Sequence, residues 1–136
     1  MNPTPHLLVC VTDPARGLEL ISIGRQLADK QEMDLKVLAV LRHPKDPKNA
    51  TVMQTLYNLC ARFSAELTVL FRKNPALTMA MTAKRTDAAG LLCDVPPIAG
   101  QDFVACLREL LPDISISVLD ESDTLLTFPP RTVHTV

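Results

Sequence analysis

The sequence contains few glycines and none of the glycine-rich loops that usually bind phosphate groups. Four glycines occur among its 136 residues. Neither G-x-x-x-x-G-K-[ST] nor G-x-G-x-x-G is present, which excludes the P-loop and dinucleotide-binding fingerprints. The G-x-S-x-G elbow of the α/β hydrolases is missing as well. The common sequence signatures of nucleotide and ester chemistry are therefore ruled out.

Long apolar runs and an excess of one charge are absent too. Apolar runs such as residues 7–11 and 37–41 are far shorter than the roughly 18 residues of a membrane span. The net charge is −1, whereas nucleic-acid-binding domains normally carry a basic excess. The first residues lack the basic and apolar regions of a secretory signal. We therefore expect a cytoplasmic protein with neither a membrane nor a nucleic acid as partner.

The cysteines and histidines do not form the spacings of a metal site or a disulfide framework. No C-x-x-C pair occurs, and the histidines are scattered along the chain. Three of the four cysteines lie in apolar patterns, where a free cysteine behaves as a small buried hydrophobic residue. The four are Cys10, Cys60, Cys93 and Cys106. We expect core packing for them, with no disulfide and no bound metal.

The chain alternates short apolar runs with helical patterns. Strands are predicted at 7–11, 35–41, 66–71, 88–95 and 114–119, and helices at about 14–31, 50–65, 75–86 and 101–111. Short links between alternating strands and helices favour parallel pairing with right-handed crossovers. The fold class predicted is therefore α/β, a Rossmann-like three-layer sandwich with a five-stranded parallel sheet.

Local signals place several helix boundaries and contacts. Asp13-Pro14 and Asn74-Pro75 each combine a good N-cap with a proline suited to the first helical turn. Gly24 lies inside a helical pattern, which predicts close packing of that helix on a strand. In the third helix Met81 is predicted in the core and Met79 partly exposed.

The C-terminal region carries no helical pattern after residues 114–119. Residues 124–128 form a short extended pattern, and Pro129-Pro130 begins a tail. We interpret residues 1–136 as one domain in which residues 121–136 are a loose C-terminal extension.

Several segments resemble one family. Residues 6–13 (HLLVCVTD), 25–29 (RQLAD) and 35–40 (LKVLAV) resemble the opening of the universal stress proteins. They are especially similar to the variant found within bacterial potassium-sensor histidine kinases. The similarity continues through residues 65–70 and 75–77 and covers about residues 6–119. The chain is thus identified, by resemblance, as a universal-stress-protein-like domain.

The resemblance implies a sheet order of 3-2-1-4-5, dimerisation through the fifth strands and, in one branch, ATP at the ends of strands one and four. Asp13 and Val40 match the two positions that border the base in that branch. Its glycine loop after strand four, G-x-x-G, about nine residues, then G-[ST], is not found here. Residues 91–101 read LLCDVPPIAGQ, with Pro96-Pro97 and only Gly100 remaining.

This departure bears on phosphate binding. A phosphate cradle needs backbone N–H groups and close approach of the chain, but proline has no N–H and Asp94 would repel an anion. We therefore predict no cofactor, with ATP as the one considered and not favoured. The candidate crevice is formed by Thr12, Asp13, Val40, Asp94 and Gly100, where such sheets reverse direction. Arg16 borders it in the first helical turn, where we expect it solvated. The same residues also have structural roles, since Asp13 caps a helix and Thr12 ends a strand.

Two functions are compatible with these observations. The first is a non-enzymatic regulatory or binding module, a homodimer through strand 114–119, without the ATP loop. The second is a nucleotide-binding domain with a modified phosphate loop and at most weak hydrolase activity. A phosphate-accepting receiver domain is disfavoured, because strand three ends in Phe71-Arg72-Lys73-Asn74 rather than in an aspartate. For the sheet edge, folding back of residues 124–128 is the alternative to pairing with a second chain.

Overall fold

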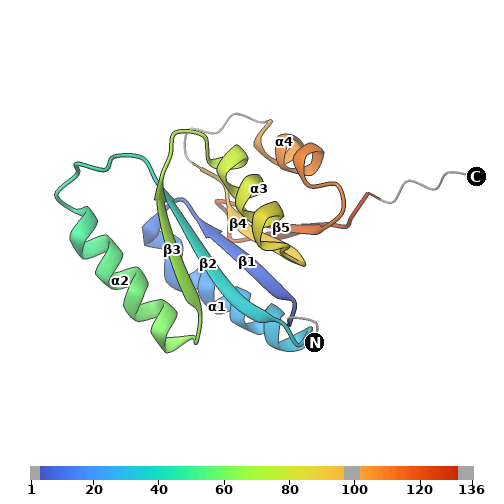
Figure 1. Cartoon of the computed structure of the whole chain (residues 1–136), viewed down its shortest axis with the longest axis horizontal. Helices are drawn as coiled ribbons and strands as arrows, with labels where there is room; N and C mark the ends of the chain where they lie inside the picture. Colours follow the sequence, from blue (N-terminus) through green and yellow to red (C-terminus); the bar gives the residue numbers. More distant parts are fainter. Residues whose placement is uncertain (1–3, 97–101, 132–136) are drawn as a thin grey trace, which may run out of the picture.

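The computed structural model describes residues 4–96 and 102–131. It is a three-layer α/β sandwich around one sheet (Figure 1). The elements in chain order are β1 (His6–Val11), η1 (Pro14–Arg16), α1 (Gly17–Lys30), β2 (Asp34–Leu41), α2 (Asn49–Arg62), β3 (Glu66–Phe71), α3 (Pro75–Thr86), β4 (Gly90–Asp94), α4 (Phe103–Leu110), β5 (Ser115–Leu119) and β6 (Leu125–Phe128). The α/β prediction is confirmed.

The sheet has the order β3-β2-β1-β4-β5-β6. The first five strands pair in parallel, and β6 is added antiparallel to β5. All six residues of β1 are buried, as expected for a strand covered by helices on both faces. The predicted order 3-2-1-4-5 is therefore confirmed, with one strand added at its end.

The core consists of two apolar layers, one on each face of the sheet. Alternation along the strands sends Val9, Val37 and Leu92 to the face covered by α1 and α2. Cys10, Leu38 and Cys93 point to the opposite face, under α3 and α4. Both layers are filled by buried side chains.

The two proline-containing signals begin helices as predicted. Asp13 Oδ1 accepts a hydrogen bond from the Ala15 N–H at 3.0 Å and starts the η1 turn that leads into α1. Asn74 Oδ1 accepts one from the Leu77 N–H at 3.1 Å at the start of α3. Each side chain satisfies a backbone donor that the first turn leaves free.

The helices are short. α1 and α2 contain 14 residues each. Among the helices of the described residues, none is long and apolar enough to cross a membrane.

The orientation of α3 differs from the prediction. Met79 is completely buried, whereas Met81 is 61% exposed. The helix buries Ala76, Met79, Ala80 and Ala83 against the sheet. Alanines form most of the buried face, whereas larger apolar residues lie on the exposed side. A prediction based on residue size therefore places the buried face about one position too far along the helix.

β6 covers the sheet edge that was expected to be free. Its residues pair with β5 from Ile116↔Phe128 to Leu119↔Leu125. Ser117 Oγ lies 3.1 Å from Thr127 Oγ1, and the Arg108 guanidinium of α4 stacks on the Phe128 ring at 4.9 Å from its centroid. The alternative in which residues 124–128 fold back is thus what the structure shows. Strand 114–119 is an inner strand, and the extension expected to be loose contains an ordered strand.

Candidate functional site at the ends of β1 and β4

The candidate crevice contains a buried carboxylate. Asp94, the last residue of β4, is completely buried. Its Oδ1 accepts hydrogen bonds from the Thr12 N–H at 3.0 Å and the Thr12 hydroxyl at 2.8 Å. Its Oδ2 accepts from the Asp13 N–H at 2.9 Å and the Thr12 N–H at 3.1 Å. Both oxygens are therefore bound by the segment that follows β1.

The parallel register explains this contact. In the parallel register Cys10 pairs with Cys93. The residues that follow these two cysteines therefore lie next to each other at the same edge of the sheet. After Val11 the chain leaves the ladder, and the N–H groups of Thr12 and Asp13 need other acceptors. The Asp94 carboxylate supplies them.

Burial raises the pKa of the Asp94 carboxyl above its ordinary value of 3.8. Hydrogen bonds from the Asp13 N–H and from the Thr12 hydroxyl and N–H oppose this rise, because they stabilise the ionised form. Both carboxylate oxygens are thus already held by protein donors. A phosphate placed there would meet a like charge and donors that are already used.

Asp13 has the capping role predicted for it. Its carboxylate binds the Ala15 N–H and its own backbone N–H binds Asp94. The residue is partly exposed. Among the predicted residues, Thr12, Asp13 and Asp94 are brought together.

Arg16 is not the solvated residue that was expected. Its side chain is only 18% exposed and forms an ion pair with Asp123 at 2.8 Å. It also approaches the Leu119 carbonyl oxygen at 3.4 Å and Glu19 at 3.7 Å. Arg16 therefore ties the start of α1 to the turn between β5 and β6. The two residues are 107 positions apart in the sequence, so no local pattern predicts this contact.

Val40 does not add to this arrangement. Val40 is 1% exposed and packs in the core layer under α3 and α4. Its side chain is occupied by core contacts. Gly100 lies outside the described residues.

The three buried cysteines offer no activated nucleophile. Cys10 and Cys93 are opposite each other in the sheet and completely buried, and burial raises the pKa of both thiols. Burial also raises the pKa of Cys60 to about 11. Cys106 is exposed, so the expectation of core packing is wrong for that residue. Among residues 4–96 and 102–131, no three metal-ligating side chains form a cluster.

A second hollow lies far from this crevice, between α2 and β3. It is a cavity of about 310 Å³ lined by Tyr57, Cys60, Ala61, Ala65, Leu67 and Val69. No sequence motif marks this cavity, because its lining comes from two separate elements, α2 and β3. An exposed tyrosine on α2 beside an apolar strand was the available signal.

Comparison with known proteins places the fold. No protein-family model and no curated protein matches the sequence. A universal stress protein solved in complex with cAMP is 14% identical, with a TM-score of 0.60 over 90% of this chain and 100% of that one. A universal stress protein from Archaeoglobus fulgidus is 16% identical, with a TM-score of 0.59 over 88% and 98%. Its complex with dAMP gives a TM-score of 0.58 at the same identity and coverage. The chain therefore has the universal-stress-protein fold.

Proposed function

We propose that this protein is a universal-stress-protein-like binding or regulatory module that is not an enzyme and lacks the ATP-binding loop. One observation carries the proposal, namely the position of Asp94. Its buried carboxylate occupies the donors at the ends of β1 and β4. At this position the hydrogen bonds of Asp94 join the end of β4 to the segment that follows β1. We call this arrangement the Asp94 joint.

The energetics of this joint support the proposal. A ligand that used the Thr12 and Asp13 N–H groups would have to displace Asp94 and leave its carboxylate without partners. Leaving a buried charged group unpaired costs about 1–3 kcal/mol or more. Pro96, which is buried directly after this strand, offers no N–H to compensate.

A nucleotide-binding domain with a modified loop is the second candidate. Two of the similar structures contain cAMP and dAMP, which favours a nucleotide at this fold. Asp13, which matches a base-contacting position in one branch of the family, is also partly exposed. Under this alternative the nucleotide would bind in one of two ways. It would make no hydrogen bond to the Thr12 and Asp13 N–H groups, or it would displace the Asp94 carboxylate that these groups bind.

The two candidates are separated by nucleotide binding to the full-length protein. Mass spectrometry after denaturation should find no co-purified nucleotide. Calorimetric titration with Mg-ATP, AMP and cAMP should show no saturable binding below the millimolar range, equivalent to about −4 kcal/mol. A micromolar dissociation constant for any of the three would support the second candidate instead.

We also propose that the module is a homodimer, with the interface moved from strand 114–119 to β6. The Asp120 N–H donates to the Thr124 carbonyl oxygen at 3.0 Å, so alternation directs the backbone groups of Leu125 and Thr127 away from β5. Two such edges can pair antiparallel about a two-fold axis at Leu126, which is 44% exposed.

The dimer is tested by light scattering at micromolar concentration. Thr127→Pro removes an outward N–H without touching the ladder to β5, and we expect it to give a monomer. The matched variant Val69→Pro on the opposite edge should remain a dimer. A monomeric unmodified protein would contradict this part of the proposal.

A further inference from the structure

The opposite edge of the sheet, β3, has free backbone groups. The Arg72 N–H donates to the Leu41 carbonyl oxygen at 2.9 Å, so even-numbered residues of this strand bind β2. In a parallel ladder the backbone N–H and C=O groups of the residues in between then point away from β2. The N–H and C=O groups of Leu67, Val69 and Phe71 therefore face outward. The Phe71 carbonyl oxygen already accepts a hydrogen bond from the Arg72 guanidinium at 2.9 Å. No strand of the described residues lies on that side.

This edge has little of the protection that edges normally carry. Apart from the exposed Glu66 at its first position, β3 contains neither proline nor a charged side chain, which are the residues that discourage pairing. By contrast, β6 has four residues and is followed directly by Pro129-Pro130. β3 is thus the longer edge open to an added strand.

The helix α2 forms a wall beside the edge. In Figure 1, α2 lies outside β3 rather than behind the middle of the sheet. The cavity of about 310 Å³ is lined by residues of both elements and mainly by apolar side chains. Tyr57 is 63% exposed and lies among the residues that line it. An added strand would be covered on one face by this helix.

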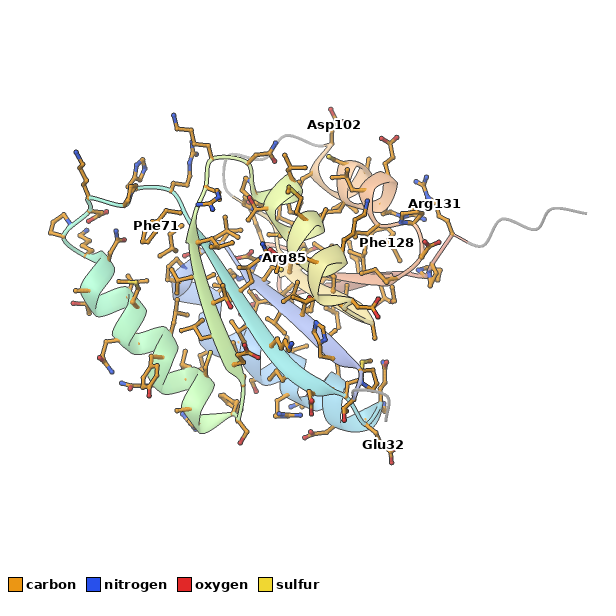
Figure 2. All side chains as sticks on the ribbon, in the orientation of Figure 1. Glu32, Phe71, Arg85, Asp102, Phe128 and Arg131 are labelled. Carbon is orange, nitrogen blue, oxygen red and sulfur yellow. The ribbon has the colours of Figure 1, made fainter. Side chains whose placement is uncertain are left out.

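The carboxyl end of the β3 edge is strongly basic. Figure 2 shows nitrogen-tipped side chains around the labelled Phe71, where the loops after β2 and β3 meet. Five exposed cations occupy these loops, namely Arg42, Lys45, Lys48, Arg72 and Lys73. One acid, Asp46, accompanies them, and its Oδ1 accepts the Lys48 N–H. Among the described residues none of the five cations forms an ion pair.

We infer that an extended segment of a partner protein adds a strand to β3. Its apolar side chains, at alternate positions, fill the groove against Tyr57 and Ala61. Acidic residues at one of its ends lie beside Arg72 and Lys73. Backbone pairing supplies affinity, and the groove and the cations select the sequence.

A second copy of the chain does not fit this edge as well. A two-fold axis that pairs β3 with another β3 keeps both α2 helices on the same face of the joined sheet. Because each α2 projects past its own edge (Figure 1), the two helices would compete for the same space. A lone extended segment has no such helix. This inference concerns a different surface from the nucleotide crevice and does not depend on it.

The experiment uses the full-length protein and synthetic peptides as probes. Each peptide alternates valine and threonine over six residues and carries three aspartates, at the N-terminal end in one peptide and at the C-terminal end in the other. Peptides of the same composition in scrambled order are the controls. Amide hydrogen exchange is followed by NMR with and without peptide.

We expect one of the acidic peptides to slow exchange of the Leu67, Val69 and Phe71 amides about tenfold or more at saturation. The Thr68 and Leu70 amides should change little, because they already bind β2. This alternation distinguishes strand addition from non-specific binding or general stabilisation. Equal protection of all five amides, or equal effects of scrambled peptides, would overturn the inference.

Three variants and one control variant localise the binding. Val69→Pro removes the central outward donor and should abolish binding, while Thr127→Pro on the other edge should leave it unchanged. Tyr57→Ser alters an exposed side chain and should weaken binding about tenfold without loss of stability. Arg72→Glu should abolish the preference for acidic peptides. If Val69→Pro does not fold, the Tyr57 and Arg72 variants decide.

Self-association provides the remaining test. If the unmodified protein forms a dimer that Val69→Pro dissociates and Thr127→Pro does not, the β3 edge binds a second copy and the inference is wrong. Absence of any peptide binding overturns it as well. Neither result bears on nucleotide binding at Asp94.

Discussion

Gly24 in α1 and Val9 in β1 are so close that the helix position cannot hold a Cβ atom without a shift. A Cβ placed on Gly24 would lie 2.5 Å from Val9 Cγ2 and 3.3 Å from Leu35 Cδ1. The close packing predicted from the glycine is confirmed. It lets α1 approach the sheet, which offsets the cost of about 1 kcal/mol for glycine inside a helix.

We expect Gly24→Ala to lower the free energy of unfolding by about 1–3 kcal/mol, because overpacking outweighs the better helix propensity of alanine. Urea denaturation measures the change. Gln26→Ala on the exposed side of the same helix is the control and should have little effect. Combining Gly24→Ala with Val9→Ala should cost less than the sum of the two. A neutral Gly24→Ala would contradict the packing.

Asp94→Asn should destabilise the fold by about 1–3 kcal/mol. In the native protein the Thr12 and Asp13 N–H groups bind the two carboxylate oxygens. The amide of asparagine keeps only one oxygen, so its NH₂ group would face one of these N–H donors. Thr12→Val removes only the hydroxyl donor and should cost about 0.5–1.5 kcal/mol. The exposed Asp113→Asn serves as control for the loss of charge, and Asp94→Asn behaving like it would argue against the joint.

The two methionines of α3 should respond oppositely to truncation. Met79→Ala should cost about 2–5 kcal/mol, because it leaves a cavity under α3. Met81→Ala, on the exposed side, should change stability by about 0.5 kcal/mol or less. Thermal or urea unfolding of the two variants checks the orientation of the helix, and a reversed pattern would restore the prediction made from the sequence.

His6 should make stability depend on pH near neutrality. Its side chain is 4% exposed, and Nε2 lies 3.1 Å from Thr86 Oγ1. Burial, with a smaller effect of Lys36, lowers its pKa below the ordinary 6.5. The unfolded chain then binds the proton more readily than the folded one. Stability is therefore complete above about pH 6.5 and is lost as the pH falls from there to the lowered pKa.

Urea unfolding from pH 8 to pH 5 measures this dependence, with His6→Gln as the reference. The difference between the two curves isolates His6 from Asp94, whose raised pKa acts in the opposite direction above pH 3.8. Asp94 stays protonated to higher pH in the folded state, so its contribution to stability grows as the pH falls in that window. Parallel curves for the two proteins would show that His6 titrates alike in both states.

Thiol labelling should distinguish the four cysteines. In the native protein only Cys106 is exposed, so an aromatic disulfide reagent should modify one thiol quickly. The other three are buried with raised pKa values and should react only on unfolding. Cys106→Ser should remove the fast phase, and a second fast thiol in that variant would contradict the core assignment.

Much of the fold follows from local patterns in the sequence. The continuous apolar run of β1 requires cover on both faces, which places this strand inside the sheet. Asp13-Pro14 and Asn74-Pro75 begin helices because a side-chain acceptor and a missing N–H suit the first turn. The close approach at Gly24 was also predictable, since only a packing contact explains a glycine there.

The candidate site was predicted as a set of positions but not as a set of contacts. Asp94 was identified as an obstacle to phosphate, whereas its hydrogen bonds to Thr12 span 82 residues and have no sequence signature. Arg16 is predicted to be solvated, because its partner Asp123 is distant in the chain. The phase of α3 was ambiguous because apolar side chains occur on both of its sides.

The sequence by itself determined the strand and helix order, the caps and the central place of β1, because periodicity and capping act between near neighbours. Only the tertiary structure decided the burial of Asp94, the Arg16–Asp123 ion pair and the addition of β6. It also decided that β3 retains a free edge beside α2. These features depend on which distant segments meet. The sequence around a backbone N–H or a carboxylate does not indicate which distant group will form its hydrogen bond or ion pair.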